Sequence, residues 1–158
     1  MTLFKSYYQL CKPNVVYMML ICAFVGMLLA EQTVSSYSYL FIALTGIALC
    51  AASAAAINQV VDREADASMT RTDQRPLPKG DLSVMHASIF AFVIGLLGAL
   101  ILYFYVNVLT MILTIGSLIG YAFIYTVYLK RATPQNIVIG GLAGAAPPLL
   151  GWSSISNT

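Results

Sequence analysis

Three polar residues, Asn58, Asp62 and Asp66, recur at every fourth position next to a strongly apolar part of the chain. If the helical period continues through them, they share one helix face, drifting about 40° per step and rising roughly 6 Å between neighbours. Glu64 then points the opposite way. Mg²⁺ binds proteins through one or two carboxylates and leaves its other positions to water and substrate phosphates. The spacing therefore predicts a metal site formed by all three residues, with the two aspartates as catalytic groups.

Basic residues follow this acidic stretch closely. Arg71 and Arg75 can each bind phosphate oxygens bidentately, whereas Lys79 supplies only a point charge. Two prolines and a glycine exclude a continuous helix over residues 66–82, so we expect a structured lid there. Lys12 either faces a bound anion or only anchors the chain at the membrane surface. A cation site beside an anion clamp indicates that a diphosphate is held here.

The composition places these residues in a membrane protein. Of the 158 residues, 59% are hydrophobic and 9% charged, and the mean hydropathy is +0.83. Several apolar runs approach the ~20 residues that cross a hydrocarbon core. We expect an all-α integral membrane bundle, a single domain over residues 1–158, with five spans at residues 15–30, 39–57, 85–105, 108–129 and 135–155.

The positive charges predict how the bundle is oriented. Every Lys and Arg lies before the first span, between the second and third, or between the fourth and fifth. Because cytoplasmic connections carry the excess of positive residues, we expect the N-terminus and residues 58–82 and 130–134 in the cytoplasm. The short stretch ahead of the first span does not resemble a transit peptide, which favours a bacterial inner membrane.

Aromatic and capping residues mark the fourth and fifth spans. Tyr121, Tyr125 and Tyr128 share one helix face. They either line a cavity, where aromatic rings stabilise a carbocation, or form an interfacial aromatic belt. Thr133 and Pro134 read as the N-cap and first residue of the fifth span, which would direct its free N–H groups at the same chamber.

Small residues predict where the spans touch. Residues 51–56 are almost all alanine, and Gly140, Gly141 and Gly144 lie in the fifth span. Such residues let helix backbones approach closely. The face carrying Asn58 is therefore expected to look into the bundle and not at lipid, where an ionised group would cost ~2.5–3.5 kcal/mol.

The run Asn58-x-x-x-Asp62-x-x-x-Asp66, with the arginines that follow it, resembles the first acidic motif of the UbiA-type intramembrane prenyltransferases. The block over residues 125–136 is similar to the branch of this family that joins the farnesyl group of farnesyl diphosphate to a vinyl group of protohaem IX, giving haem O. The resemblance implies Mg²⁺ bound through the diphosphate and a catalytic role for Tyr125. The predicted diphosphate-binding residues are Arg71, Arg75, Lys130, Arg131, Asn136 and Lys12.

The same resemblance implies a bundle of about nine spans with a second acidic motif, so this chain is expected to be the N-terminal part of such an enzyme. The implied partners are farnesyl diphosphate, protohaem IX and the lipid bilayer, with haem-biosynthesis or terminal-oxidase assembly proteins as further candidates and no nucleic acid. The resemblance also implies that water quenches the positive charge passed to the porphyrin side chain, a step that no residue of this sequence indicates.

Two alternatives stay open. Within the prenyltransferases, the acceptor could be an aromatic quinone precursor. From another class, a cation or substrate transporter would also place aspartates at the ends of a tightly packed bundle, but its exchange site would lie deep in the membrane. Here the acids lie at one rim, which favours the enzyme.

Overall fold

The computed structural model describes residues 3–30, 36–122 and 136–157, and within these ranges every regular element is a helix. Pro13 begins the second helix, and Ser83 caps the fifth by accepting a hydrogen bond from the backbone N–H of His86 (3.2 Å). The all-α fold class predicted from the sequence is confirmed. The elements are α1 (Leu3–Leu10), α2 (Pro13–Leu29), α3 (Tyr37–Val61), α4 (Arg63–Ala67), α5 (Val84–Tyr105), α6 (Val108–Ile119) and α8 (Asn136–Ser156).

Two of the described helices, α3 and α5, are individually long and apolar enough to cross a membrane. A third span is present if α1 and α2, which are bent by 46° at the break between them, are counted as one. These helices make the chain an integral membrane protein. The predicted number of five spans stays a prediction, and the end of the fourth expected span lies outside the described residues.

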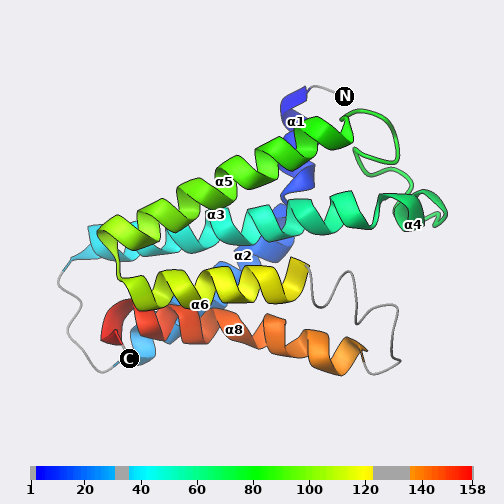
Figure 1. Ribbon diagram of the computed structural model, residues 1–158. Coiled ribbons are helices and arrows are strands. Elements are labelled where there is room, and N and C mark those ends of the chain that lie inside the picture. Colours follow the sequence, from blue (N-terminus) through cyan, green and yellow to red (C-terminus); the bar gives the residue numbers. More distant parts are fainter. Residues whose placement is uncertain (1–2, 31–35, 123–135, 158) are drawn as a thin grey trace.

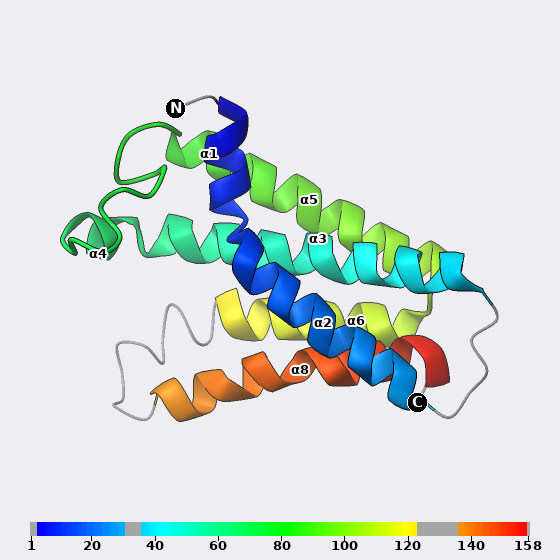
Figure 2. The same cartoon turned by 180° about the vertical axis from the view of Figure 1, so that it is seen from behind.

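The helices form a bundle of two adjoining pairs (Figure 1). α3 lies along α5, and α6 lies along α8 (Figure 1). α2 crosses the opposite side of the bundle and packs against both α8 and α3 (Figure 2). The core where they meet consists of Ala23, Met27, Leu40, Ala43, Ile47, Cys50, Leu102 and Leu150.

Glycines permit the closest helix contacts. A Cβ at Gly26 would overlap the backbone of Pro148, and one at Gly151 would overlap the backbone of Ala23, so α2 and α8 touch through both positions. The sequence-based expectation for Gly141 and Gly144 is wrong within the part of the chain that the structure describes: both are exposed, and no atom of that part lies within 4 Å of where a Cβ would stand. The contact falls instead near the C-terminal end of α8.

The alanine-rich run behaves as expected. Ser53, Ala54, Ala55 and Ala56 are all buried. The Ser53 hydroxyl donates to the carbonyl of Ala91 at 2.7 Å, which fixes α3 against α5. Small side chains therefore bring the C-terminal half of α3 into the bundle interior.

A group of uncharged polar residues, the neutral cluster, lies at the end of the bundle that holds the start of α3 and the end of α8 (Figure 1). Tyr39 donates its hydroxyl hydrogen to the Ser154 carbonyl at 2.7 Å, and the Asn107 amide donates to the Ser153 carbonyl at 3.0 Å. The hydroxyls of Thr110 and Ser153 are 3.0 Å apart. These five residues tie α3, α6 and α8 together.

Candidate active site

Asn58, Asp62 and Asp66, which we call the acidic cluster, lie where α3 gives way to α4. The helix is interrupted at Asp62, which ends α3 and precedes α4. The released Val60 carbonyl accepts a hydrogen bond from the guanidinium of Arg63 at 3.3 Å. Asp62 N–H still bonds the Asn58 carbonyl (3.0 Å), and Asp66 N–H bonds the Asp62 carbonyl (2.8 Å). The four-residue repeat of helical hydrogen bonds therefore survives the break.

The three side chains of the acidic cluster are buried, with 5% or 6% of each residue exposed. The Asn58 amide donates to a carboxylate oxygen of Asp62 at 3.0 Å. Glu64 behaves differently, because its side chain is 84% exposed and pairs with Arg63 at 2.9 Å. The structure thus separates one surface carboxylate from two that lie inside the protein.

The segment after α4 folds back over the acidic cluster. Arg75 donates to a carboxylate oxygen of Asp66 at 2.6 Å, and the buried hydroxyl of Thr72 donates to the Asp66 main-chain carbonyl at 3.0 Å. Leu77 and Leu82 anchor the segment in a second apolar cluster with Leu10, Ala56, Ala87 and Ala91. Arg71 and Lys79 stay exposed. Sequence reasoning missed Thr72, although its place between two arginines was a usable signal.

A third part of the chain brings Lys12 to the acidic cluster. Lys12 lies between α1 and α2 in a left-handed backbone conformation (φ 48°), which is uncommon for a residue with a side chain. Its ammonium group donates to the Asn58 side-chain oxygen. Of the two roles considered from the sequence, this position suits anion binding better than surface anchoring.

The side chains of the acidic cluster can be compared with the ligands that a divalent cation requires. Within the described ranges no three His, Cys, Asp or Glu side chains form a metal cluster. The acidic cluster instead offers two carboxylates and an amide oxygen, a hard oxygen donor set of the kind that Mg²⁺ shares with substrate phosphates. Arg75 and Lys12 lie close enough to balance a diphosphate. The residues present fit a magnesium diphosphate.

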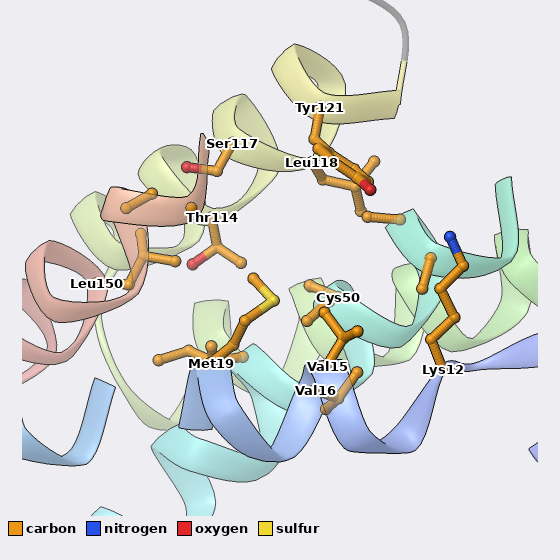
Figure 3. Close-up of a pocket in the computed structure, with 16 residues that line it drawn as sticks. Lys12, Val15, Val16, Met19, Cys50, Thr114, Ser117, Leu118, Tyr121 and Leu150 are labelled. Atoms are coloured by element: carbon orange, nitrogen blue, oxygen red, sulfur yellow. The ribbon is translucent and has the colours of Figure 1, made fainter. Parts of the chain in front are cut away.

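A cavity of about 250 Å³ leads from Lys12 into the bundle (Figure 3). Met19, Cys50 and Thr114 lie between Lys12 and Leu150 (Figure 3). Its wall is mostly apolar, with the phenol of Tyr121 near the Lys12 end (Figure 3). Because small residues of α3, including Ala51, Ala54 and Ala55, form part of the wall, room remains for an apolar substituent beside the polar site.

Several predicted site residues cannot be placed. Tyr125, Lys130 and Arg131 lie outside the described residues, as do Tyr128 and the Thr133–Pro134 pair. Asn136 is the first residue of α8, but its side chain is not described. The structure brings together Asn58, Asp62, Asp66, Arg75 and Lys12, whereas Arg71 lies on the exposed side of the loop.

Comparison with known proteins supplies the family. The curated relatives include protoheme IX farnesyltransferase 2 of Pseudoalteromonas atlantica, 58% identical over 97% of this chain and 50% of the relative. The protoheme IX farnesyltransferases of Idiomarina loihiensis and Hahella chejuensis are 57% and 55% identical, over 97% and 98% of this chain and 51% and 52% of theirs.

The chain therefore spans about half the length of the curated relatives it matches. No solved structure matches it. The sequence profile described as the UbiA prenyltransferase family matches residues 19–158. This chain, with a buried acidic cluster in contact with a lysine that lines an apolar cavity, belongs to the UbiA prenyltransferase family.

Proposed function

We propose that the chain provides the diphosphate-binding part of an enzyme that transfers the farnesyl group of farnesyl diphosphate to a vinyl group of protohaem IX, giving haem O. One observation carries this proposal: the acidic cluster, with its two buried carboxylates bonded to cationic and amide side chains, contacts Lys12, which lines an apolar cavity. The names of relatives at 55–58% identity, all protoheme IX farnesyltransferases, supply the acceptor and the prenyl group.

Asn58, Asp62 and Asp66 are the residues that would hold Mg²⁺. When bound, the ion would neutralise charge on the diphosphate leaving group. The protein's own share is to keep both carboxylates buried and aligned, through the Asn58 amide on Asp62 and Arg75 on Asp66. A preorganised polar site of this kind needs little rearrangement when charge develops.

The basic residues would bind the diphosphate oxygens. Arg75 and Lys12 already lie at the acidic cluster, and Arg71 follows on the same loop. We assign Lys130, Arg131 and Asn136 to the same task from the family resemblance. These side chains would stabilise the negative charge that develops on the leaving diphosphate, which favours breaking of the allylic C–O bond.

The cavity would hold the isoprenoid chain away from water. Its apolar wall suits a hydrocarbon, and Tyr121 presents an aromatic ring beside the position where the allylic cation forms. Tyr125 is assigned the same stabilising role. The diphosphate leaves with the electron pair of the C–O bond, and the vinyl carbon of the porphyrin attacks the allylic carbon. Water then adds to the resulting carbocation and loses a proton, which leaves a hydroxyl group.

The distribution of Lys and Arg supports an orientation in the bacterial inner membrane with the N-terminus and the acidic cluster on the cytoplasmic side. Farnesyl diphosphate would then enter from the cytoplasm. Haem-biosynthesis or oxidase-assembly proteins are proposed as further partners, since the product passes on to a terminal oxidase.

The decisive experiment supplies membranes holding the full-length protein with farnesyl diphosphate, Mg²⁺ and either protohaem IX or an aromatic quinone precursor. We expect haem O to form, and its formation to stop when a chelator removes the Mg²⁺. Prenylation of the quinone precursor alone would replace the acceptor in this proposal. Failure to prenylate either acceptor, in membranes that contain the folded protein, would refute it.

A further inference from the structure

Gln59 follows Asn58 directly, yet its side chain contacts a different part of the chain. It is 2% exposed, and its amide nitrogen donates to two main-chain carbonyls at the end of α1, those of Gln9 (3.1 Å) and Leu10 (2.9 Å). This side chain therefore joins α3 to the end of α1, about fifty residues earlier in the sequence.

The Gln9 carbonyl loses its usual helical donor because of Pro13. In a continuous helix the Gln9 carbonyl would accept from the N–H of residue 13, but proline has none, and its ring would clash with that carbonyl. α1 therefore ends at Leu10, and α2 begins at Pro13 with a 46° bend between them. At the Gln9 carbonyl the Lys12 N–H and the Gln59 amide replace the missing helical donor, and the Gln59 amide also bonds the Leu10 carbonyl.

The bend determines where Lys12 points. Lys12 occupies the break with φ 48°, a conformation that side chains disfavour, so neighbouring contacts must hold it there. Its backbone N–H donates to the Gln9 carbonyl at 3.1 Å, the same oxygen that Gln59 binds. The Lys12 ammonium then reaches the Asn58 side chain at the cavity mouth.

We propose that Gln59 is a positioning residue for diphosphate binding. By holding the carbonyls at the end of α1, it keeps the Lys12 backbone in its left-handed conformation and the ammonium over the acidic cluster. The inference rests on the proposed function, since Lys12 matters here only as a ligand for the diphosphate.

The test measures Mg²⁺-dependent binding of farnesyl diphosphate to the full-length protein in membranes, together with thermal stability. Gln59→Met keeps the size of the side chain but removes both hydrogen bonds, and Gln59→Glu does so while keeping its shape. Each should weaken binding roughly 10-fold. Gln74→Met, at an exposed position with no assigned role, is the matched control.

A double variant separates positioning from general support of the fold. In a Lys12→Met background, Gln59→Met should weaken binding no further, because its effect passes through Lys12. A second readout needs no ligand: labelling of the Lys12 amine by an acylating reagent, measured by mass spectrometry, should rise in Gln59→Met.

The outcomes are distinguishable. Full additivity of the two substitutions, or wild-type binding in both Gln59 variants, would overturn the positioning role. Increased labelling of Lys12 without weaker binding would overturn it as well. A wild-type protein that binds no farnesyl diphosphate would instead remove the proposed function, and the inference with it.

Discussion

The two buried polar groups at opposite ends of the bundle are built differently (Figure 1). In the neutral cluster, Tyr39 and Asn107 donate hydrogen bonds to main-chain carbonyls of α8, which can act only as acceptors. In the acidic cluster, Asp62 and Asp66 accept from the side chains of Asn58 and Arg75, which come from separate segments.

The two clusters differ in whether a ligand can replace the hydrogen-bond partners of their polar atoms. A main-chain carbonyl bonded by a neutral side chain is a fixed structural contact, and losing it leaves a buried polar atom unsatisfied. A carboxylate bonded by a guanidinium can pass to a metal ion while the guanidinium passes to a phosphate. The acidic cluster also contacts Lys12, which lines the cavity, whereas the five residues of the neutral cluster are not part of the cavity wall. Burial of polar atoms therefore marks function only when their partners are exchangeable and face a space.

The strongest test of this difference between the two clusters is to neutralise the carboxylates of the acidic cluster. Asp62→Asn or Asp66→Asn removes a charged ligand with little change in shape, so the rate of haem O formation by the full-length protein should fall about 10²–10³-fold, or roughly 3–4 kcal/mol. Glu64→Gln is the matched control, since this carboxylate is exposed. Equal losses at all three positions would show an unspecific acidic surface.

Arg75 tests whether a partner in the acidic cluster is shared with the substrate. Arg75→Gln leaves the Asp66 carboxylate buried without its cation and removes a phosphate ligand, so KM for farnesyl diphosphate should rise roughly 10-fold or more. Steady-state kinetics measures this, with Lys79→Gln on the exposed side of the loop as the comparison. An unchanged KM would confine Arg75 to a structural role.

The α2–α8 crossing gives a stability test without polar chemistry. Gly151→Ala forces a Cβ into the Ala23 backbone and should destabilise the bundle by about 1–3 kcal/mol. Gly141→Ala, where no atom of the described residues lies within 4 Å of the new Cβ, should change the midpoint of thermal unfolding little. Similar losses at both glycines would mean that the close contact is not at Gly151.

The smallest expected effect is at the neutral cluster. Asn107→Ala removes the N-cap of α6, which accepts from the Thr110 N–H at 2.7 Å, and the bond to the Ser153 carbonyl. Stability should fall by about 1 kcal/mol, while KM for farnesyl diphosphate stays unchanged. A rise in KM without a loss of stability would show that the neutral cluster also acts on the substrate site.

The sequence predicted what helix geometry alone determines. The four-residue spacing of Asn58, Asp62 and Asp66 was enough to group them, because backbone hydrogen bonds impose that spacing even across the break at Asp62. The exposed position of Glu64 followed from the same geometry.

What the sequence could not predict depends on contacts between distant segments. The Lys12–Asn58 and Gln59–Leu10 bonds form only once α1 and α2 are bent against α3, and Pro13 shows where the bend lies but not its direction. The glycine contact was placed too early in α8 because small residues permit close packing at many positions, and only the crossing of α2 selects Gly151.

At Lys12 the requirements of stability and of chemistry conflict, because the left-handed backbone disfavours a long side chain while the site uses its ammonium group. Glycine would adopt this conformation without strain, and asparagine more readily than lysine, so selection for stability alone would replace the lysine. Either replacement would remove the ammonium from the cavity mouth. Attempts to make this protein more heat-resistant by relieving backbone strain would therefore find a gain at residue 12 and lose substrate affinity with it.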